Sequence, residues 1–269
     1  MTLASDISTT STALSDIKQA IINKGVTPSG NITTYAAAIG NIGGIGITRE
    51  VKNGVYQMPT ENFTFSLPSD ATDVGAYGLY YAFYGCTGLT SVDLSSLTTL
   101  SGNMGIYYTF RGCTALTSVD LSSLNTVSSN NGLNAAFYGC TGLTSVDLSS
   151  LTTLSGSYGL AYSFYSCASL TSISFPALET ISNNSVLSWA FGYCTSLTSI
   201  SFPALTTSSF GTTYNNQFSN MMNGTGSTTT HTIHFPSNLQ STISGLSGYP
   251  NFGGKSGYVT LVFDLPATS

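Results

Sequence analysis

Residues 83–100 read FYGCTGLTSVDLSSLTTL, and the same letters return at residues 137–154. Altered spellings of this stretch begin at Phe110, Phe164 and Phe191. The period is 27 residues over four intervals, as the five cysteines show at positions 86, 113, 140, 167 and 194. A fixed period between about 20 and 50 residues is typical of stacked repeats. The sequence therefore predicts a solenoid in which each 27-residue repeat is one rung.

Apolar residues two positions apart recur in every rung. Val92 and Leu94 would share one face of a strand, because successive side chains of a strand point to opposite faces. The equivalent pairs are Val119 and Leu121, Val146 and Leu148, Ile173 and Phe175, and Ile200 and Phe202. So short a strand is not stable alone, and we expect the copies to stack as a parallel ladder.

A second apolar pattern precedes each strand. Leu79, Ala82, Phe83 and Cys86 lie at i, i+3, i+4 and i+7, which is the spacing of one helical face. We therefore predict that each rung consists of a strand, a turn, a second extended piece and about two helical turns. The cysteines share the face of Phe83 and are odd in number, so they are expected to be buried free thiols.

The repeat resembles the BspA-like, or treponemal-type, leucine-rich repeat, whose rungs carry A-F-x-x-C-x-x-L-x-x-I-x-(L/F)-P. Residues 82–94 match this pattern, and Phe175-Pro176 and Phe202-Pro203 restore its proline. The match covers about residues 61–236. The rung is longer than is usual in that family, and Ser-Ser replaces the proline step in the first three full rungs. The resemblance implies a leucine-rich-repeat solenoid, a parallel β ladder plus short helices, that serves as a display scaffold for attachment at bacterial surfaces.

Residues 1–42 have a different pattern. Their apolar positions predict two short helices that expose more apolar surface than they can cover, at Leu14, Ile17, Ile21 and Ile39. Residues 17–28 followed by residues 34–39 resemble a module at the head of many phage virion and tail-fibre proteins. The resemblance implies a helical attachment module that binds a virion or oligomer partner. The alternative is that residues 1–42 cap the solenoid.

Three further segments complete the expected organisation. Residues 43–60 are a linker with a β-hairpin, because Asn53-Gly54 favours a tight turn between two strands. Residues 61–236 are the solenoid. Its first rung is a degenerate copy of the repeat, and six residues are inserted before the strand that contains Thr232. Residues 237–269 are a C-terminal cap that ends in a strand.

Aromatic residues gather at the three positions of each rung that would face away from the core of the predicted helix. They are Tyr80, Tyr81, Tyr84, Tyr107, Tyr108, Tyr138, Tyr162, Tyr165 and Trp189. Tyrosine and tryptophan are enriched at binding hot spots. These residues are therefore candidates for a surface that binds a host protein or glycan. The alternative is that the rings pack on one another across the rungs.

Other candidate sites are weaker. Asp93, Asp120 and Asp147 form a column on the strand face, where repulsion would raise their pKa values or attract a cation. The neighbouring serines supply few of the oxygens that calcium needs, so a solvated acidic stripe is favoured. His231 and His234 are three apart in a strand and point to opposite faces, which does not suit a metal. No catalytic motif or cofactor motif is present, and we expect no enzyme.

Composition and charge exclude several partners. Only 6% of the 269 residues are charged and the net charge is −5, so nucleic acid is not an expected partner. No apolar stretch is long enough to span a membrane, and the first residues do not resemble a secretory signal. With the two resemblances, this predicts a phage virion appendage, a fibre or decoration protein, that attaches to a host. The alternative is a bacterial cell-surface or secreted adhesin.

Overall fold

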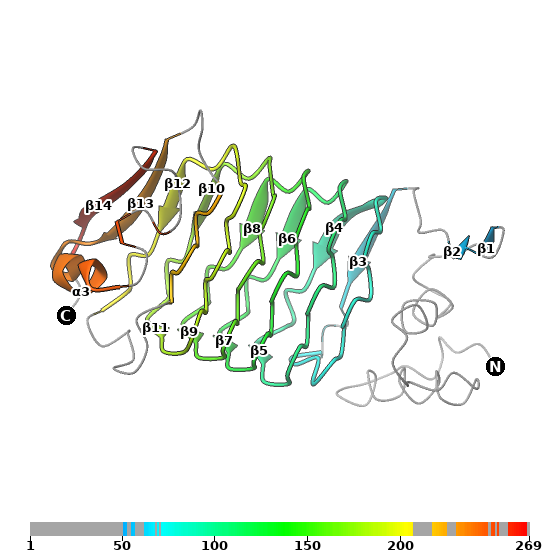
Figure 1. The fold of residues 1–269 in the computed structure, drawn as a ribbon. Coiled ribbons are helices and arrows are strands. Elements are labelled where there is room, and N and C mark those ends of the chain that lie inside the picture. The colour runs from blue at the N-terminus through cyan, green and yellow to red at the C-terminus, as the bar shows by residue number, and fades with distance from the viewer. Residues whose placement is uncertain are drawn as a thin grey trace.

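The chain forms a parallel β-solenoid of about seven turns (Figure 1). The computed structural model describes residues 51–52, 55–56, 62–67, 69, 71–206, 217–224, 230–246, 249–250, 252 and 258–267. The two helices predicted for residues 1–42, with Leu14, Ile17, Ile21 and Ile39, lie outside the described residues.

The longer strands run along one side of the solenoid in two four-stranded sheets. The first contains β3 (Phe63–Ser66), β4 (Leu89–Asp93), β6 (Ser118–Asp120) and β8 (Ser145–Asp147). The second contains β10 (Ser172–Ser174), β12 (Ser199–Ser201), β13 (His231–Pro236) and β14 (Val259–Leu265). All neighbours in both sheets are parallel.

Two-residue strands form a second ladder, visible below the first in Figure 1. Its members are β5 (Thr99–Leu100), β7 (Thr126–Val127), β9 (Thr153–Leu154) and β11 (Thr180–Ile181). Before the solenoid, β1 (Val51–Lys52) pairs antiparallel with β2 (Val55–Tyr56). After β13, the 3-10 helix η3 (Ser237–Leu239) and the helix α3 (Gln240–Ser244) add Leu239 and Ile243 to the buried core.

The strand register confirms the 27-residue spacing. Val92 lies opposite Val119, and Val119 lies opposite Val146. The degenerate first rung is in register as well, since Phe65 lies opposite Val92. Ile200 pairs with Ile233, 33 positions later, which is the predicted six-residue insertion added to 27.

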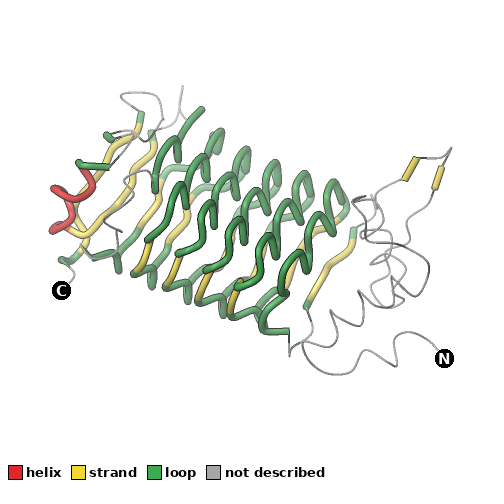
Figure 2. Tube along the Cα trace, turned by 60° about the horizontal axis from the view of Figure 1, so that its bottom comes forward, coloured by secondary structure: helices red, strands yellow, loops and turns green. Residues whose placement is uncertain are grey.

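The third side of each rung is a ribbon of consecutive turns (Figure 2), and the two predicted helical turns are wrong. Alternate N–H groups bond within the ribbon, as from Ala82 to the Leu79 carbonyl at 3.0 Å. The N–H groups between them donate to the next rung, as from Phe83 to the Thr109 carbonyl at 2.9 Å. A helix would use all its N–H groups internally. The ribbon instead uses half of them to join the rungs.

The ribbon repeats every four residues, which explains why the spacing resembled a helix. Tyr77 and Tyr81 have φ of 58° and 55°, and Gly85 has φ of 71°. These left-handed residues turn the chain back on itself at regular intervals, so residues at i and i+4 again share a side. Leu79, Ala82, Phe83 and Cys86 are therefore all buried, as a helix would also bury them.

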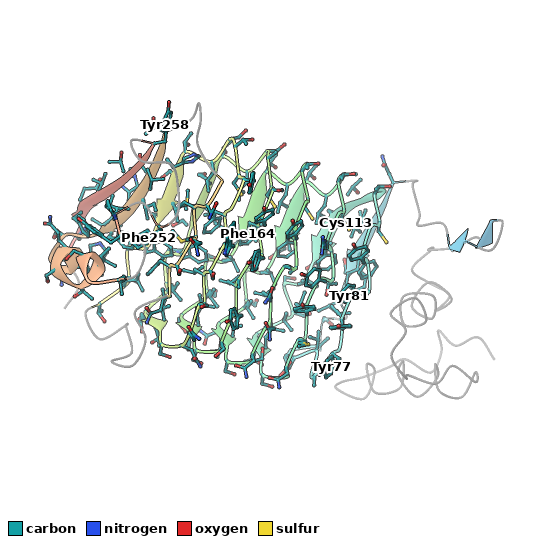
Figure 3. All side chains as sticks on the ribbon, viewed as in Figure 1. Tyr77, Tyr81, Cys113, Phe164, Phe252 and Tyr258 are labelled. Atoms are coloured by element: carbon teal, nitrogen blue, oxygen red, sulfur yellow. The ribbon has the colours of Figure 1, made fainter. Side chains whose placement is uncertain are left out.

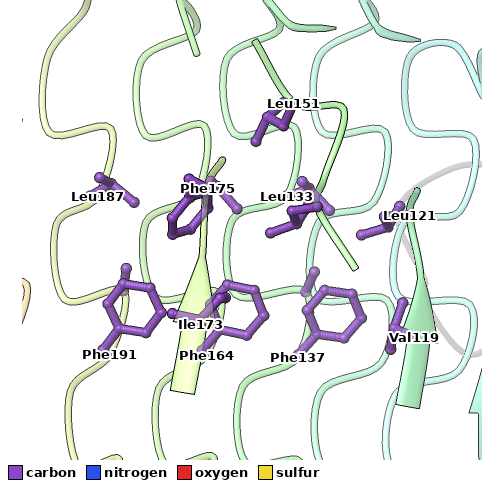
Figure 4. Packing of buried hydrophobic residues seen from close by; sticks show 14 of the residues in the cluster. Val119, Leu121, Leu133, Phe137, Leu151, Phe164, Ile173, Phe175, Leu187 and Phe191 are labelled. Carbon is purple, nitrogen blue, oxygen red and sulfur yellow. The ribbon is translucent and has the colours of Figure 1, made fainter. Parts of the chain in front are cut away.

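Stacked aromatic rings hold the core together (Figure 4). The largest column joins successive rungs with centroid separations of 5.5, 5.6, 5.6 and 5.5 Å, through Phe83, Phe110, Phe137, Phe164 and Phe191. A second column continues it toward the C-terminus, from Phe175 to Phe202 at 5.1 Å and from Phe202 to Phe235 at 5.5 Å. Each ring contacts the rungs on either side, so the core is one continuous body.

The cysteines are free and buried, as predicted. The Cys113 thiol donates to the Phe83 carbonyl at 3.1 Å, and the Cys140 thiol donates to the Phe110 carbonyl at 3.0 Å. Cys167 and Cys194 repeat this contact one rung further on. Burial raises the pKa of Cys140 and of Cys194 to about 12. These thiols are small core side chains that also join neighbouring rungs.

Close approach of two rungs makes Gly156 sensitive to substitution. A Cβ atom at this position would overlap the carbonyl group of Ser129 in the preceding rung. We expect Gly156→Ala to destabilise the protein by about 2 kcal/mol or more, since backbone must shift to admit the methyl group. Gly245→Ala is the matched control, because its nearest neighbour would be the Thr242 oxygen at an ordinary 3.5 Å. Urea denaturation of both variants measures the difference, and equal stabilities would contradict this packing.

Candidate functional site

The turn ribbon carries all nine aromatic residues that the sequence singled out, and we call them the aromatic surface: Tyr80, Tyr81, Tyr84, Tyr107, Tyr108, Tyr138, Tyr162, Tyr165 and Trp189. All nine are half-buried or exposed, with Tyr84 the most exposed at 38%. Tyr81 and Phe164 are both labelled in Figure 3, and Tyr81 is half-buried whereas Phe164 is fully buried. The ribbon therefore presents aromatic side chains from several rungs to solvent.

The rings of the aromatic surface stack on one another across the rungs, which is the alternative that the sequence left open. Tyr80 stacks on Tyr107 at 5.4 Å and 9°. Tyr81 stacks on Tyr108 at 5.0 Å and 5°. Two further stacked pairs lie nearer the C-terminus, Tyr138 on Tyr165 at 4.5 Å and Tyr162 on Trp189 at 5.8 Å. Ring faces contact ring faces, so solvent reaches the inner rings mainly at their rims.

Arg111 connects the two groups of stacked rings. Ala135 interrupts the column between Tyr108 and Tyr162 and is fully buried. The Arg111 guanidinium lies 4.3 Å from the ring centre of Tyr138 and 5.0 Å from that of Tyr108. Such cation–π contacts stabilise a cation that is held over a ring face. Arg111 lies 27 residues after Tyr84 and 27 before Tyr138, so the repeat places it in their column, but this role was not predicted.

Burial and mutual contact raise the pKa of some tyrosines of this surface. Burial raises the pKa of Tyr165 to about 12, and the nearby Tyr138 and Tyr193 contribute in the same direction. Burial and the neighbouring Tyr108 raise the pKa of Tyr107 as well. These shifts favour the uncharged hydroxyls of Tyr107 and Tyr165, which can donate and accept hydrogen bonds.

The structure adds three exposed tyrosines at the border of the aromatic surface. Tyr77, Tyr158 and Tyr193 are 53%, 40% and 46% exposed. Tyr77 meets Tyr80 edge-on at 5.5 Å, and Tyr193 meets Tyr165 at 5.2 Å. Each of these three tyrosines lies four positions from a member of the aromatic surface. A search of the sequence with a four-residue period would therefore have identified them.

The carboxylates of the acidic column accept hydrogen bonds from nearby backbone groups. Asp93, Asp120 and Asp147 each accept the backbone N–H of the residue two positions ahead, at 2.9 Å. The Ser95 hydroxyl, followed by its N–H, lowers the pKa of Asp93. The expectation that repulsion raises the pKa of this carboxyl is therefore wrong, because hydrogen bonds favour the charged form more. These carboxylates stabilise the turn that follows each strand.

The two histidines occupy different environments, as their spacing predicts. His231 is buried with Nδ1 against the Leu197 carbonyl, and burial lowers the pKa of its imidazole. His234 is partly exposed and contacts the Asp264 carboxylate at 3.0 Å. In the described parts of the chain, no group of three or more His, Cys, Asp or Glu side chains could hold a metal ion.

Comparison with known families identifies the repeat. The model of the BspA type leucine rich repeat region matches residues 50–185 and residues 158–244, with six copies of the repeat. The chain belongs to this family. The match includes every rung that carries the aromatic surface, so the aromatic surface lies on BspA-type repeats. Among curated proteins, none matches significantly.

Three solved structures are similar to this BspA-type protein. The leucine-rich repeat protein of T. pallidum, TpLRR, is 22% identical over 72% of this chain and 87% of its own, with a TM-score of 0.41. A leucine-rich repeat protein from Bacteroides ovatus is 20% identical over 74% and 66%, with a TM-score of 0.25. A leucine rich cell surface protein from Faecalibacterium prausnitzii is 12% identical over 77% and 89%, with a TM-score of 0.22.

The described segments of this BspA-type protein contain little helix. Within them, no helix has the length and apolar character needed to cross a membrane. The virion location predicted from residues 1–42 has no support in the matching family. The repeat resemblance stated from the sequence is confirmed, and the resemblance to a phage module stays a prediction.

Proposed function

We propose that this BspA-type protein is a non-enzymatic adhesin of a bacterial cell surface or of the extracellular space. The observation that carries the proposal is the aromatic surface, where stacked tyrosines and Trp189 leave their rims exposed along one side of the solenoid. Dense exposed aromatic surface is unusual on a protein without a partner. The family adds the expectation of a display scaffold at a bacterial surface.

Stacking prepares this surface for binding. Each ring is held by its neighbours, so contact with a partner would cost little side-chain entropy. Aromatic side chains recur along the stacked rungs, which suits an extended partner that runs along the solenoid. A host surface protein or a glycan chain has this character. Both offer hydroxyl and amide groups to the phenol hydroxyls, and apolar patches to the ring rims.

The family supports the cell-surface role better than the virion appendage. The virion reading depended on residues 17–28 and 34–39, which lie outside the described residues. The adhesin role depends on the repeat itself, whose family is shown over residues 50–244. We therefore prefer attachment from a bacterial surface, with a host protein or glycan as the partner of the aromatic surface.

Paired substitutions of Tyr108 and Tyr162 test the adhesin role. Replacing both by Phe keeps the stacked rings and removes the hydroxyls, so we expect unchanged thermal stability and at least tenfold weaker binding to host cells and glycan panels. Replacing both by Ser removes the stacked contacts seen with Tyr81 and Trp189. We expect the Ser pair to lose about 2 kcal/mol of stability as well as binding.

The control lies on the other side of the solenoid. Asp120→Asn with Asp147→Asn keeps an oxygen that can accept the turn N–H groups while removing both charges. This variant should bind as the unmodified protein does. Loss of binding in the Asn pair, with full binding in the Phe pair, would place the contact on the strand face and refute the proposal.

A further inference from the structure

Among the described residues, strand β14 has a neighbouring strand on only one side. It is the last strand of the ladder, at the left end in Figure 1, and it pairs in parallel with β13. Its seven residues, VTLVFDL, contain no proline and no Lys or Arg. Proteins usually protect open edges of this length with such residues, because an unpaired edge is a template for another strand.

The backbone groups of the open edge can be assigned from the pairing with β13. His231 lies opposite Val259, and its N–H donates to the Tyr258 carbonyl at 2.7 Å. In a parallel ladder the N–H and C=O of one residue face the same side, and the side alternates along the strand. Thr260 and Val262 therefore face β13, while Val259, Leu261 and Phe263 face outward. Within the described chain, these outward groups have no hydrogen-bond partner.

The side chains of β14 have the same chemical order from either end. The order is apolar, polar, apolar, Val262, apolar, polar, apolar. If a second copy pairs antiparallel about a twofold axis at Val262, Leu261 lies opposite Phe263 of the second copy. Thr260 then lies opposite Asp264 of the second copy, so each carboxylate meets a hydroxyl and the two carboxylates stay apart. The outward backbone groups also meet as hydrogen-bonded pairs in this register.

The rung of β14 also has apolar side chains on which no rung of the described residues packs. Val259, Leu261 and Phe263 pack against the core yet remain partly exposed. Phe263 extends the second phenylalanine column, that of Phe175, Phe202 and Phe235, and stacks on Phe235 at 5.9 Å. We propose that two copies of the chain pair edge to edge through β14, antiparallel about Val262, and form a twofold dimer of solenoids. The dimer would carry two aromatic surfaces, which would raise the avidity for a repetitive partner.

Substitution of Thr260 by opposite charges tests the dimer and its register. Thr260 is exposed, so either charge should leave the folded monomer intact. Thr260→Lys places a cation opposite Asp264 of the second copy, whereas Thr260→Glu places a second anion there. By light scattering over a concentration series, we expect the full chain to dimerise. The dissociation constant of the Glu variant should be roughly tenfold or more higher than that of the Lys variant, since twofold symmetry counts each cross-strand pair twice.

A cysteine at the proposed axis provides a second test. Val262 would face Val262 of the second copy in a non-hydrogen-bonded pair, where Cα atoms lie close enough for a disulfide. Val262→Cys should therefore give a covalent dimer under mild oxidation, because the five native thiols are buried. Thr260→Cys is the control and should not cross-link, since it lies opposite Asp264. A monomer at all concentrations, or cross-linking of both variants alike, would overturn the proposal.

Discussion

Phe137→Ala is expected to destabilise the solenoid by about 3–5 kcal/mol, as truncations of buried phenylalanine do. The ring is fully buried and stacks on Phe110 at 5.6 Å and 2° and on Phe164 at 5.6 Å and 13°. Its removal leaves a cavity and breaks the phenylalanine column in the middle. Because each rung contacts only its neighbours, the two halves of the stack would also lose part of their mutual support.

Urea denaturation with two probes measures this effect. Trp189, the one tryptophan of the chain, lies on the C-terminal side of Phe137 and reports that half by fluorescence. Circular dichroism reports the whole stack. We expect both midpoints to fall, and the two probes to separate if the halves uncouple. Tyr138→Phe is the neighbouring control and should change stability by less than about 0.5 kcal/mol. A loss below about 1 kcal/mol in Phe137→Ala would show that the ring is not a central support.

Stability is expected to fall steeply in alkali, because the buried thiols cannot ionise in the folded state. The pKa of Cys140 and of Cys194 is about 12 in the fold, against an ordinary value of 9.0. The unfolded chain therefore releases these protons first as the pH rises. Their contribution to stability is fully present below about pH 9 and is lost as the pH rises toward 12. By about pH 11 the loss approaches roughly 3 kcal/mol for each thiol.

Other groups with raised pKa values also make the stability fall as the pH rises. Burial raises the pKa of Cys113 and Cys167, and Tyr165 has a pKa of about 12 against its ordinary 10.0. Urea titrations at several pH values between 7 and 11 measure the slope. In a variant with Cys140→Ala and Cys194→Ala, the slope above pH 9 should be smaller. Stability that stays constant from pH 8 to pH 11, or thiols that react with an alkylating reagent in the folded protein, would contradict the buried thiol column.

The rung period and the columns could be predicted from sequence because near-identical repeats must align. When one residue of a rung is placed, its copies 27 positions away follow, and this located the strand pairs, the phenylalanine column and the buried cysteines. The degenerate first rung followed from the same spacing, as did the inserted residues before β13. These features depend on the order of residues along one chain, which the sequence contains in full.

The remaining features depend on contacts between rungs. A helix and a four-residue turn ribbon bury the same positions, so the pattern of buried residues does not distinguish them. The hydrogen bonds do, because N–H groups such as that of Phe83 donate to the next rung instead of to their own turn. The stacking of Tyr81 on Tyr108, and the place of Arg111 between two groups of rings, likewise require side chains of neighbouring rungs at known separations. The sequence therefore determined which residues line each side of the solenoid, whereas tertiary structure alone decided how their backbone and rings meet across the roughly 5 Å between rungs.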